Sequence, residues 1–226
     1  MPPAGRSRWA ARARTWHAAA VRALPDDQPW VFDLVSPDHA RRAAALARHE
    51  VLRAEATAAR RRANEIWARE GWNRAAENTY QRRLDQTLAG LVDAFCRAED
   101  PVVRAHYAPY AVLYLRWEER FLPELKASWS CSPWTTKEVV LRGLTRGGVP
   151  AEQEPEIADL ILASLRRPYR CKDWMYAGLL RHVAPVERIA ELDDDRARFA
   201  RHVLAHPELT ITRFSYPRWL AAQPAR

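Results

Sequence analysis

The sequence contains little glycine and cysteine, and it contains no long apolar run. Only 7 glycines occur in 226 residues, which excludes the glycine-rich loops that bind phosphates in nucleotide-binding enzymes. The 3 cysteines are odd in number and form no CxxC pair, so neither a disulfide framework nor a zinc site is expected. No run of about 18 apolar residues is present, so no membrane-spanning helix is expected. We therefore expect a protein of the reducing cytoplasm that has no metal or cofactor and no membrane contact.

Positive charge is prominent in the composition. The chain has 36 basic and 28 acidic residues, a formal charge of +8 and a pI of about 9.8, which favours an anionic partner. Most of the cations are arginines, a preference that is also typical of GC-rich coding sequences. Residues 1–25 hold five arginines and no acid, residues 26–130 hold 16 basic and 16 acidic residues, and residues 131–226 hold 15 basic and 12 acidic residues. The excess charge is thus expected in an N-terminal arm and in C-terminal patches.

Apolar residues recur at helical spacing through most of the chain, which predicts an all-α fold. A long helix is predicted from Ser36, as its N-cap, to Gly71, as its C-cap. The pattern predicts a second, continuous helix over residues 73–98. A third begins at Asp100, with a kink at Pro109.

Shorter segments follow in the C-terminal part. One helix is predicted to start at Thr135, with Glu138 completing a capping box. Only in Leu209–Phe214 do apolar and polar residues alternate as they do in a β-strand. The predicted fold is an irregular helical bundle with a C-terminal set of short helical hairpins and at most one short β-strand. We expect three parts. Residues 1–29 form a basic N-terminal arm with a linker, residues 30–130 form a long-helix bundle, and residues 131–226 form a short-helix domain with an extended tail.

The stretch Glu156–Val183 contains two amphipathic segments joined by a basic elbow, and Asp173 is expected to cap the second helix. Such a pair is either a helix-turn-helix or a plain αα-hairpin. Cations at the elbow suit phosphate contacts, and an aromatic ring there suits stacking on a base or sugar. The predicted nucleic-acid-binding residues lie in the elbow and the N-terminal arm: Arg166, Arg167, Tyr169, Arg170, Lys172, Arg8 and Arg12.

The middle of the first long helix is another charged segment. Residues 53–64 contain no large apolar side chain, so this part cannot bury much surface. It is predicted to project into solvent, to pack closely through alanines, or to contact a partner through Arg60, Arg61 and Arg62.

One short pattern has a catalytic counterpart. Residues 201–206, RHVLAH, place an arginine and a histidine at the ends of an Arg-polar-x-x-x-His arrangement. This arrangement resembles the signature of helical HEPN ribonucleases. The resemblance implies that His206 would perform acid–base chemistry and that Arg201 would stabilise phosphate charge at a dimer interface.

The leading hypothesis is a cytoplasmic, non-catalytic helical protein that binds DNA or RNA mainly through the phosphate backbone. The alternative is an adaptor or assembly subunit, which would bind a protein partner or a second copy of the chain. Its binding surface would be the aromatic C-terminal tail: Phe214, Tyr216, Trp219 and Leu220. A HEPN-like ribonuclease is the third possibility.

Overall fold

The computed structural model describes residues 28–129, 132–183, 186–192 and 194–223. Helices account for all the regular secondary structure of these residues, so the predicted all-α fold is confirmed. In chain order they are η1 (Pro29–Val35), α2 (His39–Glu70), α3 (Arg74–Leu84), α4 (Leu88–Arg97), α5 (Pro101–Arg120), α6 (Leu122–Ser128), α7 (Pro133–Gly147), η2 (Ala151–Gln153), α8 (Glu154–Arg166), η3 (Asp173–Met175), α9 (Tyr176–Leu179), α10 (Val186–Ala190), α11 (Asp195–Ala205) and α12 (Ser215–Ala221).

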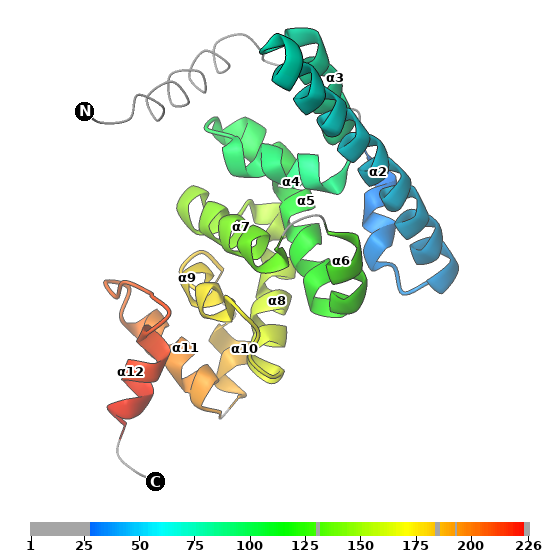
Figure 1. Ribbon diagram of the computed structural model, residues 1–226. Coiled ribbons are helices and arrows are strands. Elements are labelled where there is room, and N and C mark those ends of the chain that lie inside the picture. Colours follow the sequence, from blue (N-terminus) through cyan, green and yellow to red (C-terminus); the bar gives the residue numbers. More distant parts are fainter. Residues whose placement is uncertain (1–27, 130–131, 184–185, 193, 224–226) are drawn as a thin grey trace, which may run out of the picture.

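Helix α5 is the centre of the fold. It begins as predicted, because the Asp100 carboxylate accepts hydrogen bonds from the backbone N–H groups of Val102 and Val103. Its second half is buried almost all round, and α4, α7 and α8 pack against it (Figure 1). A single apolar core cluster runs from Val31 in η1 to Val203 in α11, and it includes residues from both sides of the boundary expected at residue 130.

Helix α2 extends beyond this core. It ends as predicted at Gly71, whose φ of 81° favours a residue without a side chain. Its first half packs on η1, whereas its second half packs mainly against α3 (Figure 1). The N-cap predicted at Ser36 is wrong: Asp38 caps the helix by accepting from the backbone N–H groups of Ala40 and Arg41.

The continuous helix predicted over residues 73–98 is also wrong, because the chain breaks between α3 and α4. The Thr87 hydroxyl donates to the Leu84 carbonyl at 2.7 Å and accepts from the Gly90 backbone N–H at 3.1 Å. Thr87 is therefore the N-cap of a new helix. A side chain at Gly90 would overlap the Leu84 carbonyl oxygen, so the glycine permits the sharp bend.

The C-terminal helices also depart from the predicted bounds. Helix α7 begins at Pro133 after Ser132, so the cap predicted at Thr135 is wrong. The segment predicted as a strand is irregular over residues 209–212 and ends in a turn at Arg213 and Phe214. The prediction of at most one strand is met, because the described residues contain none.

A buried histidine links α2 to the core. The His49 ring lies edge-on to Trp117 and stacks parallel to Trp129, with centroids 5.2 and 6.4 Å away. Its Nε2 lies 3.4 Å from the Ser128 carbonyl oxygen. Burial lowers the pKa of His49, although the Ser128 carbonyl opposes the shift. The ring is therefore neutral in the folded protein at neutral pH.

We expect His49 to make the protein less stable in mild acid. Its pKa is lower in the folded than in the unfolded chain, so protonation favours unfolding as the pH falls below about 6.5. Urea unfolding across this range, compared between wild type and His49→Phe, measures this contribution. The variant should lose less stability than the wild type as the pH falls. Equal losses in the two proteins would contradict the assignment.

Candidate nucleic-acid interface

The elbow between α8 and η3 places most of its cations against carboxylates. Arg167 donates from Nε to Glu119 Oε2 and from Nη1 to Asp173 Oδ2, both at 2.6 Å. Its side chain is only 12% exposed. Arg167 therefore bridges α5 to the start of η3, and little of its guanidinium group is available to an external phosphate.

Two further elbow cations are also paired. Arg170 Nη1 donates to the Glu118 carbonyl oxygen at 2.7 Å and to that of Glu119 at 3.2 Å. These carbonyls lie in the last turn of α5, where a cation also complements the helix dipole. Lys172 Nζ lies 2.6 Å from Glu138 Oε2 on α7. Both side chains thus hold the elbow against the end of α5 and the side of α7.

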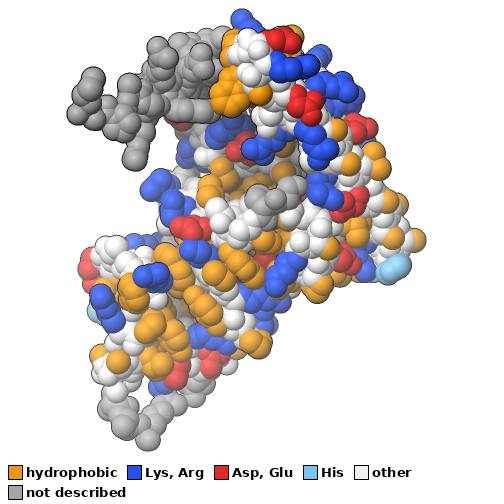
Figure 2. Space-filling view, in the orientation of Figure 1, with side chains coloured by type: hydrophobic (Ala, Val, Ile, Leu, Met, Phe, Trp, Pro, Cys, Tyr) orange, Lys and Arg blue, Asp and Glu red, His pale blue; other side chains and the backbone are white. Residues whose placement is uncertain are grey.

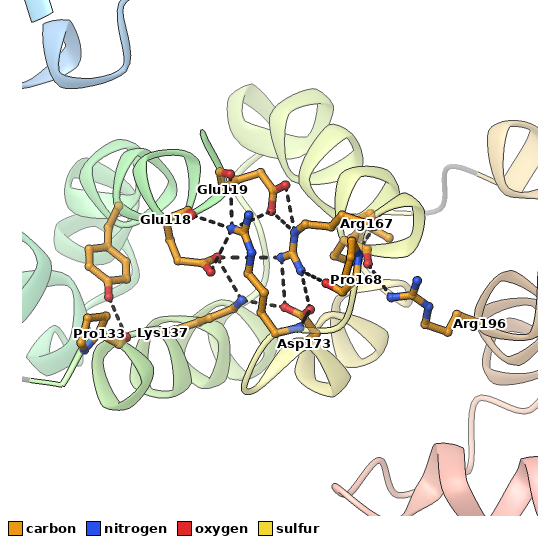
Figure 3. A network of polar contacts seen from close by, with 12 residues as sticks. Glu118, Glu119, Pro133, Lys137, Arg167, Pro168, Asp173 and Arg196 are labelled. Carbon is orange, nitrogen blue, oxygen red and sulfur yellow. Dashed lines mark hydrogen bonds and ion pairs between the residues drawn. The ribbon is translucent and has the colours of Figure 1, made fainter. Parts of the chain in front are cut away.

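A buried lysine reaches these contacts from α7, between Glu118 and Asp173 (Figure 3). Lys137 on α7 is 0% exposed, and its Nζ lies 3.0 Å from Glu118 Oε2 and 2.7 Å from Asp173 Oδ1. Burial alone would raise the pKa of Asp173, but hydrogen bonds from Arg167 and Lys137 outweigh it and hold that pKa below its usual value. We call these residues the buried ion network: Glu118, Glu119, Lys137, Arg167, Arg170 and Asp173.

The role expected of Asp173 is therefore wrong. Its side chain does not cap the second helix: the carboxylate takes part in the ion network and accepts from the Arg170 backbone N–H at 2.6 Å. The helix that follows is short, since η3 and α9 together end at Leu179. A recognition helix in a DNA groove needs a longer exposed face, so this geometry matches a plain αα-hairpin.

Two of the predicted site residues remain exposed at the elbow. Arg166 lies at the end of α8 and Tyr169 follows Pro168, and neither belongs to the buried ion network. Arg8 and Arg12 fall outside the described residues. The structure therefore brings the elbow residues together, but it leaves a single exposed arginine and one exposed ring at that site.

A second basic surface lies on the part of α2 and α3 that extends from the core. We call residues 57–84 the α2–α3 hairpin. It contains seven arginines and three acids, and Lys and Arg side chains are spread over this end of the molecule (Figure 2). The balanced charge of residues 26–130 concealed this cluster, and a count over a shorter window would have found it. From the sequence, only Arg60, Arg61 and Arg62 were named as a possible contact with a partner.

Most of these arginines have no partner among the described residues. Arg83 pairs with Glu55 at 3.1 Å, and Arg82 donates to the Thr79 hydroxyl at 3.3 Å. The other five are exposed and make no hydrogen bond or ion pair within the described part of the chain: Arg60, Arg61, Arg62, Arg69 and Arg74. Unpaired guanidinium groups on a projecting surface can bind phosphates at little desolvation cost.

The residues of the HEPN-like pattern also have structural contacts. Arg201 Nη1 donates to the carbonyl oxygens of Ile189 and Leu192, at 3.0 and 2.6 Å. His206 lies just past α11, with its Nδ1 3.2 Å from Glu208 Oε1. Arg201 therefore joins α10 to α11, and its donors face backbone carbonyls.

The aromatic tail is partly docked. In α12, Tyr216 and Trp219 pack against Phe199 of α11, with ring centroids 5.5 and 5.6 Å away. Phe214 and Leu220 are exposed. The hypothesis that this tail binds a protein partner stays a prediction.

Comparison of the chain with protein-family models, curated proteins and solved structures finds no match.

Among the described helices, none is both long and apolar enough to cross a membrane. No cluster of three or more metal-ligating side chains occurs in the described part of the chain. Burial raises the pKa of the Cys96 thiol to about 12, so it is not a thiolate at neutral pH.

Proposed function

We propose that the protein is a cytoplasmic nucleic-acid-binding protein whose α2–α3 hairpin contacts the phosphate backbone. The observation that carries this proposal is the group of five exposed arginines that lack partners within the described residues. At the elbow, by contrast, three of the four cations are paired with carboxylates or carbonyls. The proposal keeps the partner class predicted from the sequence and moves its main contact surface to another part of the chain.

The shape of the hairpin supports contacts that are independent of sequence. Arg60, Arg61 and Arg62 are consecutive on α2, so their side chains leave the helix about 100° apart. They cannot all enter one groove to contact base edges. Guanidinium groups spread in this way suit phosphates, which line the outside of any nucleic acid.

We expect Arg61→Gln combined with Arg62→Gln to weaken nucleic-acid binding. Each lost phosphate contact lowers the slope of log affinity against log salt by about 1, so this variant should lower the slope by about 2. The measurement is fluorescence anisotropy of labelled oligonucleotides between about 50 and 200 mM salt.

The matched control is Arg120→Gln combined with Arg146→Gln, which removes the same charge from exposed positions on α5 and α7. This control should keep the wild-type slope. Equal effects of the two double variants would show that only net charge matters and would refute a site on the hairpin. Absence of binding by the wild type at low salt would refute the proposed function itself.

A further inference from the structure

Exposed tryptophans lie among the arginines of the α2–α3 hairpin. Trp67 in the last turns of α2 is 57% exposed, and Trp72 in the turn before α3 is 50% exposed. Tryptophan is usually buried in large part, because its ring is the largest apolar surface among side chains. The Trp67 ring thus presents extensive apolar area to solvent at the end of a basic projection.

The helix geometry aligns one tryptophan with one arginine. Arg60, Asn64 and Trp67 are spaced at i, i+4 and i+7, so they share one face of α2. Arg60 and Trp67 are about 10 Å apart along the helix axis, since each residue adds about 1.5 Å. That distance matches about three steps of a stacked strand at about 3.4 Å per nucleotide.

Such a surface fits a single strand better than a duplex. Duplex bases are already stacked on one another, so an exposed indole has no base face to contact. A duplex is also stiff, with a persistence length of about 50 nm, and it can touch only one side of a helical hairpin. A single strand is flexible, its base faces are open, and it can follow arginines that point in different directions.

We infer that the ligand of the α2–α3 hairpin is single-stranded nucleic acid, with unpaired bases stacked on Trp67 and phosphates bound by the neighbouring arginines. This inference rests on the proposed function and narrows its ligand. Stacking accepts every base, so binding has little dependence on sequence.

The test compares three labelled ligands of about 20 nucleotides, longer than a typical site: single-stranded DNA, single-stranded RNA and a DNA duplex. We expect at least one single strand to bind about 10-fold more tightly than the duplex. The strand that binds more tightly shows whether the ligand is DNA or RNA. Trp67→Ala should weaken single-strand binding by about 5-fold or more, the effect of losing one stacked base. Its effect on the duplex should be under about 2-fold.

Two variants control for the loss of an aromatic surface. Trp67→Phe keeps a ring and should retain most of the single-strand affinity. Tyr169→Ala removes an exposed ring at the elbow and should leave the affinity unchanged. Equal or tighter duplex binding, or an equal effect of Trp67→Ala on all ligands, would overturn this inference while leaving the arginine-dependent binding intact. No binding to any of the ligands would overturn the proposed function as well.

Discussion

Replacement of Lys137 by methionine is expected to lower the free energy of unfolding by about 3–5 kcal/mol. The lysine is fully buried, and its ammonium group lies within 3.0 Å of carboxylates from Glu118 and Asp173. Methionine fills a similar volume, so the loss would come from buried negative charge without its cation. Urea unfolding at neutral pH, followed by circular dichroism, measures the difference.

The matched control is Lys126→Met, which removes the same group from an exposed position on α6. It should change the free energy of unfolding by less than about 1 kcal/mol. Lys137→Met combined with Asp173→Asn should recover part of the loss, because Asp173→Asn removes one negative charge from a network that has lost a cation. Similar losses for the two lysine variants would contradict a stabilising role of the buried ion network.

Replacement of Arg167 by alanine is the second change with a large expected effect. Arg167 pairs with Glu119 and Asp173 and is largely buried, so its removal should cost about 3 kcal/mol of unfolding free energy. The loss of packing by its long aliphatic stem adds to the effect. The same urea titration measures it.

Arg166→Ala is the natural control, since the neighbouring arginine is exposed. Its effect on stability should be within about 0.5 kcal/mol. At low temperature, where Arg167→Ala remains folded, its affinity for oligonucleotides should equal that of the wild type. Lost affinity with unchanged stability would return the binding site to the elbow and contradict the structural role of Arg167.

The parts of the fold predicted from sequence are those fixed by local signals. Asp100 before Pro101 predicted the start of α5. Gly71 predicted the end of α2, and in the structure it adopts the positive φ that is typical of a C-terminal glycine. The break before α4 was missed because it depends on a close approach between Gly90 and the Leu84 carbonyl. An apolar stripe that continues across a bend is indistinguishable from one helix at the level of periodicity.

The nucleic-acid interface was harder to predict, because the sequence does not show which acidic residue lies next to each arginine in the folded protein. Arg167 and Arg170 form a conspicuous basic run, yet their partners Glu118 and Glu119 are 48 to 52 residues away in the sequence. The acids that lie near the hairpin arginines in sequence concealed a basic surface. They lowered the apparent net charge, although five of the arginines remain unpaired within the described residues.

The buried ion network also bears on the order in which the chain assembles. Lys137 pairs with Glu118, which precedes it by 19 residues, and with Asp173, which follows it by 36 residues. During synthesis α5 and α7 leave the ribosome before the elbow, so the charges of the lysine and its first partner must stay hydrated until Asp173 arrives. Closing the 36-residue loop to Asp173 costs somewhat more entropy than closing the 19-residue loop to Glu118, so we expect the contact with Asp173 to form after the contact with Glu118. A chain interrupted before residue 173 would therefore present a half-assembled core to proteases and chaperones.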